Sequence, residues 1–197
     1  LGGFLRARTA LLAQARSTAQ GRYSYPQWWI DRIRATYPEH WEAILEAGNR
    51  QPGMALRVNV RRGTRADYLR VLRDAGIEAA AVDDVGVMLN RPLPVAQIPG
   101  FAQGLASVQD VGAQLACRLL DLAPGQRVLD AFAAPGGKTA HILERESVQL
   151  VALDCDPARM QRVHANLERL GLAAVTRCAD AAALETWWDG RAFDRVL

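Results

Sequence analysis

The sequence predicts an α/β protein, with a doubly wound parallel sheet in its second half and a small α+β module before it. Three observations lead to this fold class. From residue 127 onward, apolar segments of strand length alternate with amphipathic segments of helix length, as in parallel sheets covered on both faces. The segment 130–139, "DAFAAPGGKT", ends a strand at two adjacent glycines and opens a helix. Upstream, residues 22–105 mix helix-like and strand-like segments.

Helices are predicted before strands in the first 105 residues. Residues 4–15 have the pattern of the last turns of a helix, and apolar spacing predicts helices over 25–38 and 40–50. The segment 54–60, "MALRVNV", predicts a first strand. The following predicted elements are a helix over 64–77 capped by Thr64 and ending near Gly76, a strand over 78–82, and a proline-rich connector over 90–100.

The second half is predicted to begin with a helix over 108–122, after which strands and helices alternate regularly. The predicted strands are 127–133, 148–154, 174–180 and the beginning of one at 193–197, with helices over 138–146 and 157–172 between them. Asp156 is a favourable N-cap and Pro157 a favourable first helical residue, so the second of these helices has a well-marked start.

Composition restricts the class of protein. The 197 residues are 50% hydrophobic and 23% charged, which is typical of a soluble globular chain of one or two domains. No apolar run reaches the roughly 20 residues that a membrane span needs, and Arg6 and Arg8 interrupt the first apolar stretch. The three cysteines have no metal-ligand spacing and are odd in number, which indicates a reducing compartment. We therefore expect a cytoplasmic monomer without metal or membrane.

The net charge of +3 conceals an asymmetry along the chain. Residues 1–73 contain 13 arginines and 5 acidic residues, whereas the remainder contains 11 basic and 16 acidic residues. A basic front half favours an anionic partner, of which nucleic acid is the commonest, although arginines can also simply solvate helix faces. The candidate RNA contacts surround the end of the first predicted strand and are Arg57, Arg61, Arg62 and Arg65.

The glycine segment excludes two phosphate-binding motifs. A P-loop needs a glycine five positions before the second glycine of its ending, and Phe132 stands there. The dinucleotide motif needs spaced glycines, but Gly136 and Gly137 are adjacent. A strand–turn–helix unit remains, in which ligands bind beyond the carboxyl end of the strand.

The ends of three successive strands supply candidate ligand contacts. Residues 133–138 form a turn that lets backbone N–H groups approach a ligand, Asp154 is placed to bind ribose hydroxyls, and Asp180 is placed to face an adenine amino group. Together they fit an adenosine-bearing cofactor without a polyphosphate. Taken singly, Asp154 could instead cap the following helix, Asp180 could belong to a turn, and Lys138 could be a solvated helix residue.

These motifs resemble the Sun-domain family of RNA (cytosine-5) methyltransferases. The resemblance rests on "LDAFAAPGGKT" followed by "ALDCD" and "CAD", on "SVQDVGAQL", and on "RVNVRRGTRADYLRVLRDAGI", and it covers most of the chain from about Tyr23. It implies a Rossmann-like methyltransferase sheet, S-adenosyl-L-methionine as cofactor and small-subunit ribosomal RNA as partner. The implied cofactor-binding residues are Phe132, Ala133, Ala134, Pro135, Gly136, Gly137, Lys138, Asp154 and Asp180. Many members have cysteine at the position of Phe132, but that residue is not the family's nucleophile.

The resemblance also implies the domain order. Residues 1–21 would be the tail of a NusB-like RNA-binding domain, residues 22–105 a small RNA-binding module, and residues 106–197 the first part of the methyltransferase domain. Both ends of the sequence look cut, so we expect a fragment of a longer protein.

No catalytic residue is assigned within this chain. The family mechanism needs a cysteine that adds to cytosine C6, and its members carry this residue after the fourth strand. Cys117 has the pattern of a core residue on an amphipathic helix, Cys155 is flanked by two acids that disfavour a thiolate, and Cys178 lies within a strand. The alternatives to an enzyme fragment are a non-catalytic RNA-binding module with a vestigial cofactor pocket and, less favoured, a small-molecule methyltransferase.

Overall fold

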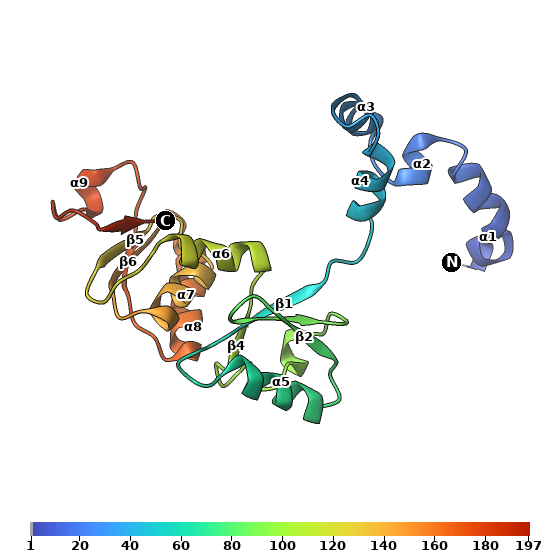
Figure 1. Cartoon of the computed structure of the whole chain (residues 1–197). Coiled ribbons are helices and arrows are strands. Elements are labelled where there is room, and N and C mark those ends of the chain that lie inside the picture. The colour runs from blue at the N-terminus through green and yellow to red at the C-terminus, as the bar shows by residue number, and fades with distance from the viewer. Residues whose placement is uncertain (1) are drawn as a thin grey trace. The chain divides into compact units, whose positions relative to one another are not determined.

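The computed structural model describes residues 2–197, which divide into two compact units at the boundary between Pro52 and Gly53 (Figure 1). The first unit is helical, and the second contains both sheets. This division differs from the predicted boundary near residue 22. The assignment of residues 1–21 to an RNA-binding domain stays a prediction.

The first unit contains four helices: α1 (Gly2–Ala15), α2 (Ala19–Tyr23), α3 (Gln27–Thr36) and α4 (Trp41–Gly48). Its small core is formed by Tyr23, Ile30 and Leu45, and the Tyr23 ring lies edge-on to Trp41 with centroids 5.3 Å apart. Helices α3 and α4 therefore bury their apolar faces against each other and against α2. The sequence groups these two helices with the strands that follow, and that domain assignment stays a prediction.

The antiparallel sheet of the second unit has the strand order β2-β3-β1-β4. Its elements are β1 (Met54–Val58), α5 (Arg65–Asp74), β2 (Ala79–Val82), β3 (Gly86–Leu89), the 3-10 turn η1 (Val95–Gln97) and β4 (Ala106–Val108). Strand β1 is central, since Leu56 pairs with Val87 of β3 and with Val108 of β4. Thr64 caps α5 in a capping box with Asp67, as the sequence predicts for the cap.

Two strands of this sheet are not predicted by the sequence. Strand β3 is four residues long and begins at Gly86, and β4 has three residues, of which Val108 falls in the predicted helix 108–122. Such short segments form because β1 supplies hydrogen-bond partners on both sides, and that is a non-local cause.

The parallel sheet has the order β7-β6-β5-β8, which confirms the predicted fold class. Its elements are α6 (Val111–Leu119), β5 (Arg127–Asp130), α7 (Gly137–Arg145), β6 (Gln149–Asp154), α8 (Pro157–Leu170), β7 (Val175–Cys178), α9 (Leu184–Trp187) and β8 (Arg195–Val196). Val128, Leu150 and Ala152 of the sheet pack against buried residues of α6, α7 and α8. Figure 1 shows these three helices on the same side of β5 and β6.

The other face of the parallel sheet differs from the prediction of helices on both faces. Within residues 2–197, the segment around α9 approaches this face, and a groove of about 600 Å³ remains there, lined among others by Val151, Val175 and Trp187. Successive residues of β6 have different surroundings, since Ala152 packs among the helices whereas Val151 lines the groove.

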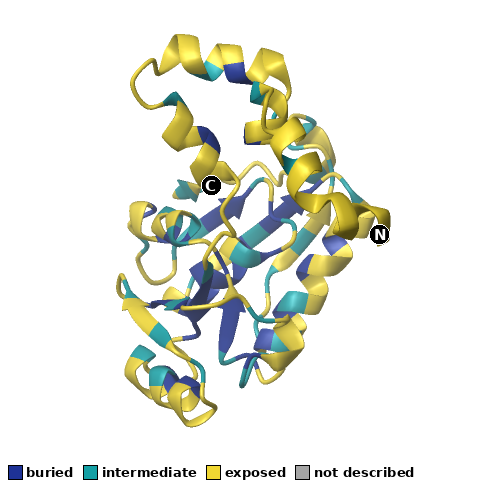
Figure 2. Ribbon diagram, turned by 90° about the vertical axis from the view of Figure 1, so that its right-hand side faces the viewer, coloured by how far each residue is buried: buried dark blue, intermediate teal, exposed yellow. Residues whose placement is uncertain are grey.

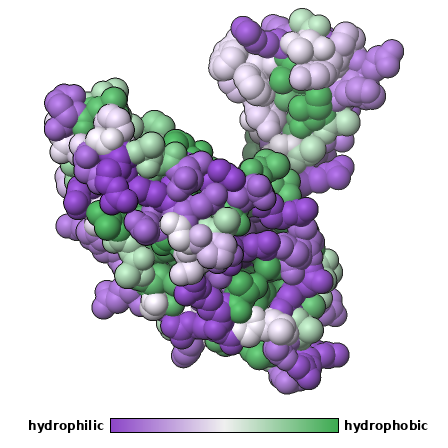
Figure 3. Space-filling model, turned by 60° about the vertical axis from the view of Figure 1, so that its left-hand side comes forward, coloured by the Kyte–Doolittle hydropathy of each residue, from purple (hydrophilic) through white to green (hydrophobic). Residues whose placement is uncertain are grey.

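Burial is concentrated in the strands and in the helix faces that cover them (Figure 2). On the surface, Figure 3 shows apolar side chains in separate patches among polar ones. In the part of the chain that the structure describes, none of the helices has the length and apolar character to cross a membrane.

Candidate functional site

The predicted cofactor segment forms the loop between β5 and α7. The backbone N–H of Ala133 donates to Leu153 O at 2.9 Å, and that of Gly136 donates to Ala133 O at 2.6 Å, so the loop is held against the end of β6. Gly136 precedes the first residue of α7 with φ of +96°, and a Cβ atom there would lie 3.2 Å from the Cα of Val163. Both the backbone conformation and the close approach of α8 therefore require glycine at this position.

Two side chains of α8 hold the carbonyl groups of this loop. Arg159 donates to Ala134 O at 3.2 Å, and Asn166 donates to Pro135 O at 2.8 Å. Sequence reasoning did not find either residue. The available signal was their spacing of seven positions, which places them on one face of the helix.

Asp154 connects the end of β6 to the same loop. Its carboxylate is buried, and it accepts hydrogen bonds from the N–H of Ala134 at 3.1 Å and from the N–H of Asp156 at 3.1 Å. The cap of α8 is Asp156, which accepts from the N–H groups of Ala158 and Arg159. Asp154 is thus not the helix cap, and the ligand-binding alternative gains support.

The other predicted cofactor residues are more exposed. Phe132 is 78% exposed, and Lys138 is exposed in the first turn of α7. Asp180 is exposed and accepts a hydrogen bond from the N–H of Ala182 at 2.9 Å, as a turn residue does. Asp154 pairs with Cys178 in the sheet, so Asp180 lies two residues beyond the neighbouring strand end. The structure joins Asp154 to the loop and leaves Asp180 at its margin.

Asp130 is a further polar residue of this region that sequence reasoning missed. It ends β5, is buried, and accepts a hydrogen bond from the hydroxyl of Thr139 at 2.6 Å. Burial raises the pKa of this carboxyl, and the hydrogen bond from Thr139 acts in the opposite direction. The contact ties the strand to the first turn of α7 across the loop.

The loop has the properties that an adenosine-bearing cofactor needs. Among the described residues, no acceptor is present for the backbone N–H groups of Gly137 and Lys138, which open α7. Such N–H groups at a helix start attract a carboxylate or another electron-rich group. The carboxylate of Asp154 lies on the β6 side of the loop and suits hydroxyl groups. The residues present therefore fit the cofactor class that the sequence predicts.

The four arginines predicted to bind RNA do not form one exposed cluster. Arg57 is fully buried and paired with Glu144, so the prediction is wrong for this residue because its guanidinium cannot reach a phosphate. Arg61 and Arg62 are exposed, and Arg65 is partly buried at the start of α5. Arg62 also donates to the carbonyl oxygens of Gln103 and Leu170, at 2.8 and 3.0 Å.

The cysteines do not form a catalytic arrangement with the loop. Cys117 is buried in α6, and burial raises the pKa of its thiol to about 11. Cys155 and Cys178 are exposed, and the Cys178 thiol lies 3.7 Å from the carbonyl oxygen of Cys155. Over residues 2–197, no cluster of three or more potential metal ligands was found.

His141, on α7, should make the folding stability of the protein depend on pH. Its side chain is buried, and no described residue is hydrogen-bonded to either ring nitrogen. Burial lowers its pKa to about 3, and the charges of Arg57 and Arg145 act in the same direction. Because the unfolded chain binds a proton at a pKa of about 6.5, stability is lost as the pH falls from there toward the folded value.

We expect His141→Leu to remove this loss. Between pH 7 and pH 5 the wild type should lose about 2 kcal/mol more free energy of unfolding than the variant, at about 1.4 kcal/mol per pH unit below the unfolded pKa. Urea unfolding at the two pH values measures both differences. Equal losses in the two proteins would show that His141 is not the group that titrates.

Two family descriptions match this chain. "Methyltr_RsmF/B-like, ferredoxin-like domain" matches residues 25–96, and "16S rRNA methyltransferase RsmB/F" matches residues 117–197. The second match contains the loop and all three predicted strand ends. The first contains the antiparallel sheet up to β3, and it also contains α3 and α4.

Curated relatives match over nearly the whole chain. The chain is 46% identical to ribosomal RNA small subunit methyltransferase B of Vibrio cholerae over 100% of its own length and 46% of the relative. It is 48% identical to the protein of the same name from Pseudomonas syringae, over 95% of the chain and 43% of the relative. The chain therefore spans somewhat less than half the length of these relatives.

Solved structures show the same fold. A methyltransferase homologue from Pyrococcus horikoshii has a TM-score of 0.77 and 26% identity, over 90% of this chain and 59% of that one. NSun6 from the same organism has a TM-score of 0.74 at 15% identity, over 87% of this chain and 69% of that one, which supports the fold alone.

Proposed function

Because this chain belongs to the RsmB/F family of ribosomal RNA methyltransferases, we propose that it binds S-adenosylmethionine and forms part of an enzyme that methylates cytosine C5 in small-subunit ribosomal RNA. The observation that carries this proposal is the buried carboxylate of Asp154, which is hydrogen-bonded to the loop at Ala134 beside the start of α7. The chain covers 46% of its Vibrio cholerae relative, so the proposal concerns the longer protein of which it would be a part.

The residues of the loop would have distinct roles. Asp154 would accept hydrogen bonds from the ribose hydroxyls, while the N–H groups of Gly137 and Lys138 would face the electron-rich end of the cofactor. Phe132, which is largely exposed, would offer an apolar surface, and Asp180 would face the adenine amino group. When bound, S-adenosylmethionine would supply the methyl group. The nucleophile that activates the cytosine would be a cysteine outside residues 1–197.

Calorimetry on the longer protein tests the cofactor. We expect binding of S-adenosylmethionine and weak or no binding of ATP, because the loop lacks the glycine spacing that wraps a polyphosphate. ATP binding without S-adenosylmethionine binding would contradict the proposal. A non-catalytic RNA-binding module is the second candidate, and it is favoured if RNA binds while S-adenosylmethionine does not.

RNA binding by this chain is proposed to depend on phosphate contacts of exposed arginines in the basic half. Arg61 and Arg62 remain candidates, since both are exposed. Arg65 also remains, although it is partly buried. Replacing Arg61 or Arg62 by Gln should lower the slope of log affinity against log salt concentration by about one unit each. Filter binding to a ribosomal RNA fragment at several salt concentrations measures the slope.

Arg162→Gln is a matched control for this measurement. Arg162 is exposed on α8, in the acidic half of the chain, and its replacement should leave the slope unchanged. Melting temperatures are needed for both variants, since Arg61 also donates to the carbonyl oxygen of Glu144 at 3.4 Å and Arg62 to two carbonyl groups. Unchanged slopes for Arg61→Gln and Arg62→Gln would show that both arginines are solvated surface residues and do not contact RNA phosphates.

A further inference from the structure

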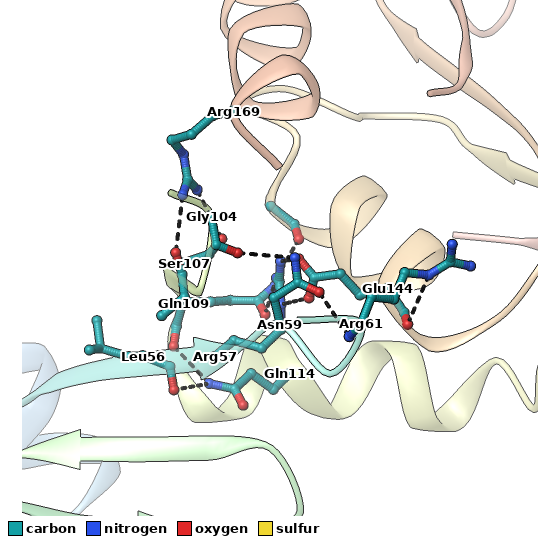
Figure 4. A network of polar contacts seen from close by, with 12 residues as sticks. Leu56, Arg57, Asn59, Arg61, Gly104, Ser107, Gln109, Gln114, Glu144 and Arg169 are labelled. Carbon is teal, nitrogen blue, oxygen red and sulfur yellow. Dashed lines mark hydrogen bonds and ion pairs between the residues drawn. The ribbon is translucent and has the colours of Figure 1, made fainter. Parts of the chain in front are cut away.

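Arg57 links the antiparallel sheet to the helix that follows the candidate cofactor loop. It lies on the central strand β1 within a network of polar contacts (Figure 4). Its side chain is fully buried. Its Nε and one terminal nitrogen donate to the two carboxylate oxygens of Glu144, both at 2.8 Å. The other terminal nitrogen donates to Gln109 Oε1 at 2.8 Å and to the carbonyl oxygen of Gly137 at 2.6 Å.

These contacts hold α7 at both of its ends. Gly137 is the first residue of α7, and Glu144 lies in its last turn. The spacing of seven residues puts both on one side of the helix, which faces β1. One planar guanidinium therefore fixes the position of α7 along its axis and its rotation about that axis.

The contact with Gly137 also holds a peptide group of the candidate site in place. In a trans peptide the C=O and the N–H of the next residue point in opposite directions. The N–H of Lys138 points out of the start of α7 because it belongs to the first turn of the helix. The bond from Arg57 to the carbonyl oxygen of Gly137 holds the peptide group that carries this N–H. No acceptor for this N–H is present among the described residues.

We infer that Arg57 is a positioning residue for the cofactor loop, acting through the Gly137 carbonyl and α7. The antiparallel sheet therefore contributes to the cofactor site through this side chain. This inference rests on the proposed binding of S-adenosylmethionine. It gives Arg57 a role in place of the RNA contact predicted from the sequence. A purely structural role would instead make Arg57 one of several residues that join the two sheets.

Arg169 provides a comparison that separates the two roles. It also joins α8 to the antiparallel module, donating to the carbonyl oxygens of Phe101 and Ala106 and to the Ser107 hydroxyl. Its guanidinium stacks on the Phe101 ring at 4.0 Å. None of these partners belongs to the cofactor loop. Loss of Arg169 therefore weakens the junction between the sheets without releasing Gly137.

The sharpest variant replaces the buried ion pair by apolar residues. Arg57→Met combined with Glu144→Leu leaves no unpaired buried charge, and such replacements are often neutral or stabilising. The double variant should therefore fold with a melting temperature close to that of the wild type, but it lacks the bond to Gly137. Arg57→Lys is a second variant, which keeps a charge beside Glu144 but cannot make all four contacts.

The measurements are made on the longer protein with Arg169→Met as the matched control. We expect the double variant to raise the Kd for S-adenosylmethionine by about tenfold or more, because the displaced N–H of Lys138 would lose its charge-assisted hydrogen bond to the cofactor. Arg169→Met should raise the Kd by less than about threefold. Without cofactor, backbone hydrogen exchange over residues 133–140 should be faster in the double variant than in Arg169→Met. Arg57→Lys should recover melting temperature more than affinity.

The outcomes separate the inference from the proposed function. A wild type that binds no S-adenosylmethionine overturns the proposed function and the inference with it. A wild type that binds, together with variants at residue 57 that bind equally well and exchange no faster, overturns the inference alone. Equal effects of the double variant and Arg169→Met on affinity also overturn it, since a general junction between the sheets would then explain both.

Discussion

Residues 1–197 alone are expected to transfer no methyl group to small-subunit ribosomal RNA above background. Methylation at cytosine C5 needs a thiolate that first adds to C6, and losing a covalent nucleophile removes this route. Cys117 is buried, with the pKa of its thiol raised to about 11 by burial. Over residues 2–197, no basic side chain is hydrogen-bonded to the sulfur of Cys155 or Cys178.

A radiolabelled-methyl assay decides this prediction. The longer protein serves as the positive control. Its triple variant Cys117→Ser, Cys155→Ser, Cys178→Ser should stay active, because the proposed nucleophile is a cysteine outside residues 1–197. Incorporation by residues 1–197 would show that one of the three cysteines is catalytic or that the mechanism is a different one.

Asp154→Ala should weaken binding of S-adenosylmethionine by on the order of 1.5–3 kcal/mol, or about ten- to a hundredfold in Kd. The carboxylate would lose its charge-assisted hydrogen bonds to the ribose, and the loop would lose its bond from the N–H of Ala134. Calorimetry on the longer protein measures the change.

Asp156→Ala is the matched control for this experiment. It removes a carboxylate two positions after Asp154. The variant loses the N-cap of α8, which contributes about 1 kcal/mol to stability. Cofactor affinity should change little. If both variants weaken binding equally, the effect belongs to the start of α8 and not to a ribose contact of Asp154.

Local signals made much of the fold predictable from the sequence. Thr64 at the start of α5 and Asp156 with Pro157 at the start of α8 act within one helical turn, and the structure has both helices there. Strands β3 and β4 were missed because their pairing with β1 comes from residues distant in the sequence.

The candidate site shows the same division between local and distant causes. Asp154 is recognisable because it ends an apolar strand, and strand ends gather at one edge of a parallel sheet. Arg57 was misassigned because its charge suggests an anionic ligand, whereas its partner Glu144 lies 87 positions away. Arg159 and Asn166 were missed since only the tertiary structure shows which loop their side chains reach.

The buried pair of Arg57 and Glu144 limits how this protein can be divided or recombined. A gene fragment that encodes only the parallel sheet leaves the Glu144 carboxylate without its partner in an apolar region, which is strongly destabilising. A chimera that joins this sheet to the antiparallel module of a relative needs a matching arginine on the central strand. For recombination, therefore, the smallest unit that can be exchanged contains both sheets.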